Sequence, residues 1–223
     1  GSNAIRQQLA NLNEAGSLYG AIIYQKAPIV MRHLESLMGD EVFRDGLREY
    51  LKAYAFGNAT WSELIAILDK RTTTDLEGWS RIWVEEPGRP VIETDLEIRD
   101  GKIARLAFVQ RAEHPKLQSK PGTWLQQLRI VLGYPDDERE LTVNINGPRL
   151  EVKDAVGLPA PQYVRPNGGG WAYAAFRIDR RSLAYFASRI HEIDDPLTRG
   201  AAWVTMWDAL LDSQVAPAAF VNA

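Results

Sequence analysis

The apolar residues of this chain change their spacing abruptly at one point, and that change limits the folds open to it. From residue 28 to residue 83 they recur every three to four positions, the period of a helix with one buried face. The segment 87–90, Pro-Gly-Arg-Pro, then interrupts any helix. From Val91 onward apolar and polar residues alternate, which is typical of a half-buried strand. The sequence therefore predicts a helical part followed by a β part.

Four helices are predicted in the first part, over 28–38, 40–54, 61–68 and 76–83. Thr60 and Glu63 fit a capping box, in which the threonine oxygen accepts from an orphan backbone N–H and the glutamate reaches back. Thr74 and Glu77 repeat that spacing before the last helix. Each helix carries a single apolar stripe, so the four are expected to pack on one another or on a further partner.

Short strands are predicted in the second part, over 91–99, 104–108, 128–134, 141–145, 150–152 and 171–178. Asp100-Gly101 and Asn146-Gly147 are both typical of hairpin turns, which need positive φ angles. About six short strands joined in this way favour an antiparallel β-sandwich. Helices return after Asp179, and Asp195-Pro196 reads as an N-cap followed by proline at the first helical position.

Composition excludes several classes of protein. The net charge of −3 supplies no basic excess, so we expect no nucleic-acid partner. The chain has no cysteine, which excludes disulfides, thiolate metal sites and a cysteine nucleophile. No apolar run reaches the roughly 20 residues of a membrane helix, so a soluble protein of the cytoplasm or periplasm is expected. Residues 1–4, Gly-Ser-Asn-Ala, read as the remnant of an expression tag.

A direct search for catalytic motifs finds none. The three histidines lie far apart, and His191-Glu192 begins an H-E-x-x-H motif whose last position is Asp195. His33 is expected to be packed in the core, and His114, which precedes a proline, to be solvated. Neither a nucleophile elbow nor a P-loop is present. From these patterns alone the chain is a helical and β-sandwich protein without a visible active site.

Residues 22–35, IIYQKAPIVMRHLE, change this interpretation. They resemble the tyrosine-bearing segment of M1 (gluzincin) aminopeptidases, approximately Y-x-K-G/A followed by a V-x-R-x-L-E helix. Residues 39–51 resemble that family's next helix, and residues 56–61 resemble its y-x-N-A-T step. Trp79, Trp83, Gly88 and Pro90 resemble its closing W-x-x-x-W…G-x-P-V signature. The resemblance continues through segments 173–179, 195–197 and 203–208, in the family's order.

The resemblance implies a multidomain protein of α and β structure. Residues 5–88 would form the helical back half of a thermolysin-like catalytic domain, and residues 89–179 an antiparallel β-sandwich. Residues 180–223 would begin a helical C-terminal domain. The family's zinc ligands and its G-x-M-E-N element lie upstream of the tyrosine and are absent here. Zinc is therefore expected in the parent enzyme but not on this fragment, which would hold no metal ligand, lack activity, and meet its peptide substrate through the missing half.

The same resemblance assigns a catalytic role to Tyr24. In the family, zinc-bound water attacks the scissile carbonyl, and zinc stabilises part of the charge that develops on its oxygen. A neutral phenol O–H can donate to that oxyanion at neutral pH. Tyr24 would be this donor, with Lys26 orienting the segment. The competing interpretation is an ordinary buried tyrosine.

Two further interpretations remain open. The chain could be a non-catalytic binding or scaffolding module with the same architecture. It could also be a carbohydrate-binding β-sandwich that uses Trp124, Trp171 and Tyr173. In addition, a truncated catalytic domain would expose an apolar patch on the helices from Tyr24 to Trp83, and we expect some self-association through it.

Overall fold

The computed structural model describes residues 3–11, 13, 16, 22–114 and 122–223. The chain divides into two compact units, one of residues 1–88 and 114–124 and the other of residues 89–113 and 125–223. The boundary after Gly88 coincides with the change in hydrophobic period. Each unit is described by itself below.

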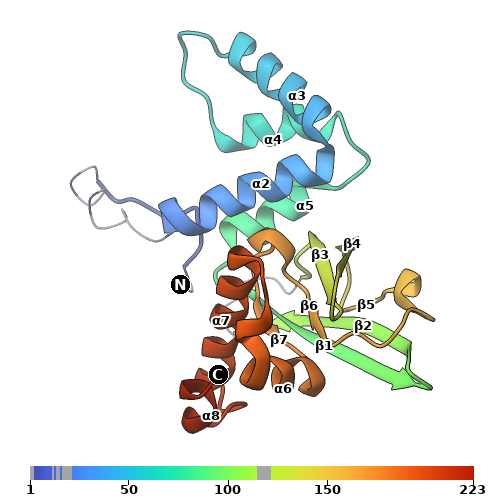
Figure 1. Ribbon diagram of the computed structural model, residues 1–223. Helices are drawn as coiled ribbons and strands as arrows, with labels where there is room; N and C mark the ends of the chain where they lie inside the picture. The colour runs from blue at the N-terminus through green and yellow to red at the C-terminus, as the bar shows by residue number, and fades with distance from the viewer. Residues whose placement is uncertain (1–2, 12, 14–15, 17–21, 115–121) are drawn as a thin grey trace. The chain divides into compact units, whose positions relative to one another are not determined.

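The described part of the first unit is helical (Figure 1). A five-residue π-helix, η2 (Ile22–Lys26), runs into α2 (Ala27–Met38), and α3 (Asp40–Ala53), α4 (Trp61–Asp69), α5 (Leu76–Ser80) and the π-helix η3 (Arg81–Glu85) follow. Their buried side chains form the core, among them Val30, Leu34, Leu64, Leu68, Leu76, Trp79 and Trp83. These elements confirm the helices that the apolar spacing predicts.

The two predicted helix caps have different outcomes. The capping box before α4 is confirmed, since Glu63 N donates to Thr60 Oγ1 at 3.4 Å and Thr60 N donates to Glu63 Oε2 at 2.6 Å. The box at Thr74 is wrong. α5 begins one residue later, and the carboxylate of Asp75 accepts from the backbone N–H of Gly78 at 2.8 Å. Aspartate caps a helix as well as threonine does, so the spacing alone misplaces the cap.

The second unit contains two sheets. The first has the order β5-β2-β1-β7 and the second the order β4-β3-β6. The strands are β1 (Pro90–Arg99), β2 (Lys102–Ala112), β3 (Gln126–Gly133), β4 (Glu138–Ile145), β5 (Arg149–Glu151), β6 (Tyr163–Arg165) and β7 (Ala175–Arg177). Side chains from both sheets meet in one core cluster, for example Phe108 of β2 with Leu128 and Ile130 of β3. The prediction of a β-rich second part is confirmed.

The expectation of a purely antiparallel sheet is wrong at one strand. β7 pairs with β1 in the parallel direction, with Val91 opposite Ala175 and Glu93 opposite Arg177. The parallel pair is allowed because a long stretch of chain, from β2 to β6, separates β1 from β7. The strand predicted over 171–178 shrinks to β7, and the three-residue β6 has no counterpart among the predicted strands.

The two predicted hairpin turns behave differently. Asp100 and Gly101 have φ angles of 49° and 70° and join β1 to β2, as expected. Asn146 and Gly147 have no positive φ, and the strand after them, β5, pairs with β2 of the other sheet rather than with β4. The β1–β2 register also shifts at Ala104, so Ile103 rather than Ala104 faces the core.

Helices complete the second unit. They are α6 (Arg180–Arg189), α7 (Pro196–Leu211) and α8 (Pro217–Val221), with short 3₁₀ turns η5 (Lys153–Ala155), η6 (Gly168–Gly170) and η7 (Ile190–Glu192). The Asp195 side chain accepts from Thr198 N at the start of α7, which confirms the predicted N-cap. Phe186 of α6 and Met206 of α7 share a second core cluster with Val131 and Tyr163 of the sheet.

Candidate active site around Tyr24

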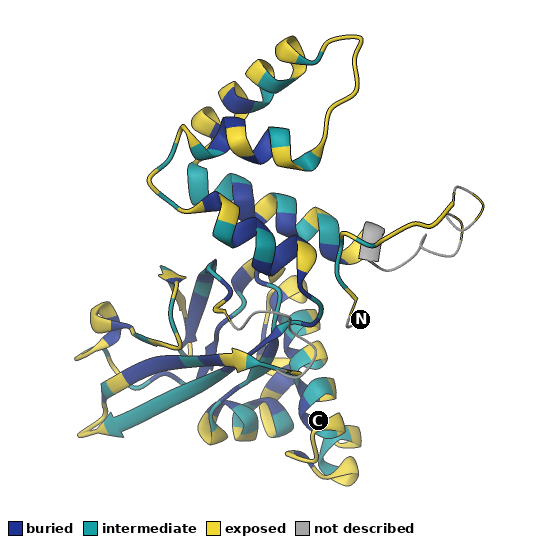
Figure 2. Cartoon of the chain, turned by 180° about the vertical axis from the view of Figure 1, so that it is seen from behind, coloured by how far each residue is buried: buried dark blue, intermediate teal, exposed yellow. Residues whose placement is uncertain are grey.

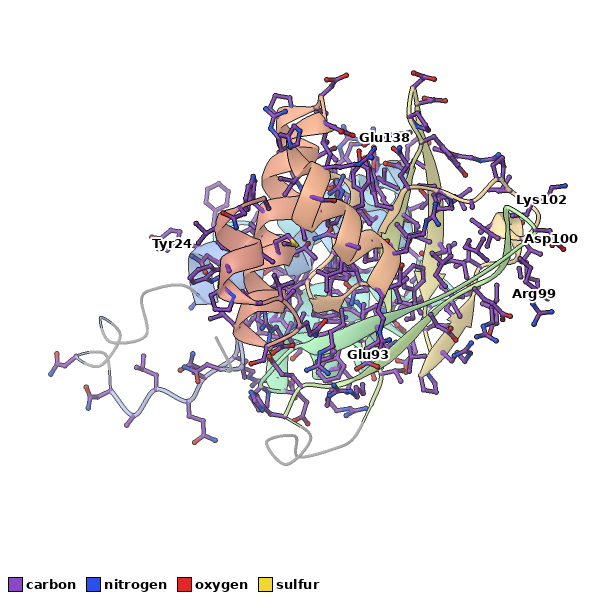
Figure 3. All side chains as sticks on the ribbon, turned by 60° about the horizontal axis from the view of Figure 1, so that its bottom comes forward. Tyr24, Glu93, Arg99, Asp100, Lys102 and Glu138 are labelled. Carbon is purple, nitrogen blue, oxygen red and sulfur yellow. The ribbon has the colours of Figure 1, made fainter. Side chains whose placement is uncertain are left out.

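Tyr24 lies in the middle of η2 and faces solvent. It is 68% exposed, and Figure 3 shows its ring projecting away from the helix. π-helical segments are rare in proteins, and those that do occur often lie at functional sites. The interpretation of Tyr24 as an ordinary buried tyrosine is therefore wrong.

Lys26 closes the same π-helix and is buried. It is 1% exposed, and its Nζ donates a hydrogen bond to the carbonyl oxygen of Gly88 at 3.3 Å. Burial removes water from around the ammonium and lowers the pKa of Lys26 to about 8. The bond joins the residue before α2 to Gly88, where the first segment of the unit ends, across 62 positions of sequence.

Helix geometry explains why these two side chains lie on opposite sides. The buried face of α2 carries Val30 and Leu34, and Lys26 precedes Val30 by one turn on the same face. Tyr24 precedes Lys26 by two positions, which is roughly half a turn of a helix. The packing that buries Lys26 therefore turns Tyr24 outward. This relation can be read from the sequence, whereas the distant acceptor at Gly88 cannot.

An aromatic contact between His33 of α2 and Trp83 of η3 supports the same helix. His33 is 2% exposed, and its ring meets Trp83 of η3 edge-on, with centroids 4.9 Å apart. Trp83 in turn lies 6.5 Å from Trp79. The expectation that His33 is a packed core residue is confirmed. η3 holds α2 through this ring pair, and the segment that follows η3 holds Lys26 through Gly88.

An apolar cavity of about 390 Å³ opens beside the same helix. It is lined by Ile5, Arg6, Ala27, Val30, Met31, Thr60, Trp61, Ser62 and Val84. Tyr24 does not line it, although Ala27 follows Tyr24 by three positions. The cavity therefore lies beside the start of α2, and Tyr24 is not one of its lining residues.

The described residues do not fit a zinc site. Across 3–11, 13, 16, 22–114 and 122–223, no three histidine, aspartate or glutamate side chains converge in a way that could hold a metal ion. His33 is packed against Trp83, while His114 and His191 are exposed on different units.

Figure 2 shows which described residues are exposed at the surface and which are buried. The large exposed apolar residues of the first unit come from several elements and are Leu9, Tyr24, Val42, Leu51 and Phe56. Self-association through them stays a prediction. Trp124 is buried, and Trp171 lies under the Arg129 guanidinium at 4.4 Å, so neither supports the carbohydrate-binding interpretation. In the part of the chain that the structure describes, every helix is too short or too polar to span a bilayer.

Comparison with known proteins finds relatives that match this sequence. Residues 1–83 match the peptidase family M1 domain. Aminopeptidase N of Streptomyces lividans is 30% identical over 229 residues, which cover 96% of this chain and 26% of that protein. Aminopeptidase M1-B of Oryza sativa subsp. japonica is 27% identical over 62% of this chain and 15% of its own length. Aminopeptidase N of Lactobacillus helveticus is 25% identical over 76% of this chain and 18% of its own length.

The chain thus spans about a quarter, or less, of the length of these relatives. The family match covers the helical unit that carries Tyr24 and Lys26, and the similarity to the Streptomyces protein continues through the second unit. These matches support an M1 aminopeptidase-like fragment.

Proposed function

We propose that this chain is the part of an aminopeptidase that supplies a transition-state-stabilising tyrosine, and that the whole protein removes N-terminal residues from peptides. Tyr24 is the residue that performs this role. The observation that carries the proposal is its 68% exposure on a short π-helix whose last residue, Lys26, is buried and bonded to Gly88. A hydroxyl presented in this way can meet a substrate that is bound outside the unit.

The chemistry requires a neutral donor. When a peptide carbonyl is attacked, negative charge develops on its oxygen, and a hydrogen bond that strengthens with that charge lowers the barrier. A phenol donates without carrying charge of its own. Lys26 positions the segment and does not touch the substrate, because its ammonium is buried against Gly88.

The metal and the domain plan belong to the whole protein. Zinc, which the resemblance implies, would be held by residues outside the described part of this chain. Residues 5–88 would be the helical portion of a thermolysin-like catalytic domain, residues 89–179 a β-sandwich, and residues 180–223 the start of a helical domain. The core that the two sheets share supports the sandwich. The chain alone is expected to be inactive.

The test uses the complete protein encoded by the reading frame that contains this sequence. Tyr24→Phe should lower kcat about 10²- to 10³-fold, the loss typical of one oxyanion donor, while zinc content and KM change little. Tyr50→Phe is the matched control, because Tyr50 lies on α3 of the same unit, and it should leave kcat unchanged.

Two results would refute the assignment. Unchanged turnover in Tyr24→Phe would show that another group stabilises the transition state. Absence of aminopeptidase activity from the complete, zinc-loaded protein would instead favour the non-catalytic scaffold. No observation on this chain favours that scaffold independently.

A further inference from the structure

β1 is longer than the strand that pairs with it on one side. β2 covers β1 along its whole length, from Pro90 to Arg99. β7 covers only Val91 to Glu93 on the other side. In Figure 1 the β1–β2 hairpin continues well past β7. Among the residues that the structure describes, no strand pairs with the β1 edge from Thr94 to Arg99.

Hydrogen bonds on the far side of β2 identify which β1 groups lie at that edge. The carbonyl of Leu106 and the N–H of Gln110 bond outward, to Val152 and Pro148. Alternate residues of a strand bond to opposite sides, so Ala107 and Val109 bond inward to β1.

Ala107 and Val109 face Asp95 and Glu93, so the odd-numbered residues of β1 bond to β2. The even-numbered residues then direct their N–H and C=O groups to the open edge. These residues are Thr94, Leu96 and Ile98. The edge therefore offers a row of backbone donors and acceptors to an incoming strand.

A groove of about 740 Å³ runs along this edge. One wall is β1, and the other is the segment that leaves β7 and begins α6. The lining residues are Glu93, Thr94, Asp95, Leu96, Ile98, Arg177, Ile178, Asp179, Arg180 and Arg181. The three residues whose backbone faces outward are all among them, so the groove and the open edge are the same feature.

The charge left over in this groove is positive. Arg177 is paired with Glu93 and Asp212, and Asp95 is paired with Arg105 and Arg149. The Asp179 carboxylate caps α6 by accepting from neutral N–H and O–H groups, so its single negative charge remains beside the two arginines that follow it.

Among the residues that the structure describes, no carboxylate forms an ion pair with Arg180 or Arg181. Arg181 donates to the backbone carbonyl of Pro161 at 2.7 Å, which leaves its charge unneutralised. Arg180 is exposed and forms no ion pair within the described ranges. Both lie at the start of α6, whose N-terminal dipole adds to the positive potential.

We propose that this groove binds an extended acidic segment of a partner protein, which adds to the sheet as a strand beside Thr94, Leu96 and Ile98. Backbone hydrogen bonds to the open edge provide the register, and a carboxylate of the segment pairs with Arg180. The inference is independent of the role of Tyr24, which lies in the other unit.

A second copy of this chain is a poorer occupant. It would bring the same two unneutralised arginines. The carboxylates on the outer face of its own β1, those of Glu93, Asp95 and Glu97, are already paired with arginines. Charge complementarity therefore favours a foreign acidic strand.

The test measures binding of a fluorescein-labelled peptide of about six residues, the length of a typical strand, in which glutamate alternates with valine. Fluorescence anisotropy with the full 223-residue chain should show saturable binding. Two control peptides should bind at least about tenfold more weakly. One replaces glutamate by lysine, and the other keeps the charges but carries N-methyl groups on alternate amides.

Arg180→Glu should weaken binding of the acidic peptide at least about tenfold. A glutamate in the first turn of α6 is favourable for the helix, so this variant should fold. Arg139→Glu is the matched control, because Arg139 is an exposed arginine on β4 of the other sheet and does not line the groove. It should leave binding unchanged.

Amide hydrogen exchange followed by NMR tests the backbone part separately. In the free chain the amides of Asp95 and Glu97 should exchange slowly and those of Thr94 and Leu96 quickly. The acidic peptide should slow exchange at Thr94, Leu96 and Ile98 at least about tenfold. Equal effects of the charge-matched N-methylated peptide, or equal effects of Arg180→Glu and Arg139→Glu, would overturn the proposal. So would protection of these amides that rises with protein concentration alone, because a second copy would then occupy the edge.

Discussion

The ammonium of Lys26 and the carbonyl of Gly88 meet at 3.3 Å inside the first unit. Gly88 has a φ of 90°, which a residue with a side chain rarely adopts, so this carbonyl is presented by a turn suited to glycine. The contact fixes the end of η2, two residues after Tyr24. A buried ammonium therefore lies two residues along the chain from the proposed catalytic tyrosine.

Burial of Lys26 makes stability depend on pH in a defined direction. The pKa of Lys26 falls from 10.5 in the unfolded chain to about 8 in the fold, so the unfolded chain holds the proton more tightly. The cost of burying the charge is fully present below pH 8 and is relieved as pH rises from about 8 to 10.5. The free energy of unfolding should therefore rise over that range, by up to about 3 kcal/mol from this group.

Lys26→Met serves as the reference for that measurement, because it has similar length and no charge. Urea unfolding at pH 7, 8, 9 and 10 should show the wild-type chain gaining stability relative to Lys26→Met as pH rises. A constant difference between the two proteins would contradict the burial of a charged lysine at this position.

Tyr24→Phe is expected to leave the fold unaffected. Tyr24 is 68% exposed, and exposed substitutions usually change stability by less than about 0.5 kcal/mol. Trp83→Ala, which empties a fully buried site in the same unit, should cost about 3–5 kcal/mol. Urea unfolding of both variants checks this contrast. A large loss in Tyr24→Phe would mean that the hydroxyl supports the fold instead of facing a substrate.

The helical unit could be predicted well because its signals are local. The apolar stripe of α2 and the box at Thr60 lie within one or two turns of the residues that they position. The tyrosine motif was recognisable for the same reason. Its support was not, because Gly88 lies 62 residues from Lys26 and acts through a backbone carbonyl, which every residue possesses.

The β unit is harder to predict because strand pairing is not local. β6 and β7 have three residues each, too few for an alternating pattern to be visible. Asn146-Gly147 looks like Asp100-Gly101 in sequence, yet β5 finds its partner on β2. Packing in the core that both sheets share decides these strand pairings, and that core exists only in the folded chain.

The two candidate caps can be distinguished by a pair of threonine substitutions. Thr60→Ala removes an acceptor that Glu63 N uses, and it should cost about 1 kcal/mol of unfolding free energy. Thr74→Ala should change stability by less than about 0.5 kcal/mol, because Asp75 is the cap of α5. Thermal unfolding followed by circular dichroism is sufficient for the comparison. Equal losses in the two variants would show that Thr74 also caps a helix.

The final prediction compares Asp100-Gly101 with Asn146-Gly147. Gly101 has a φ of 70°, so Gly101→Ala places a Cβ in the left-handed region and should cost about 1–2 kcal/mol. Gly147 has no positive φ, and an added Cβ there would meet no atom within 4 Å. Gly147→Ala should therefore be neutral or stabilise the chain by up to about 1 kcal/mol, through the entropy of the unfolded state. Urea unfolding of the two variants measures the difference, and a loss in Gly147→Ala as large as that in Gly101→Ala would indicate a hairpin turn at Asn146-Gly147 after all.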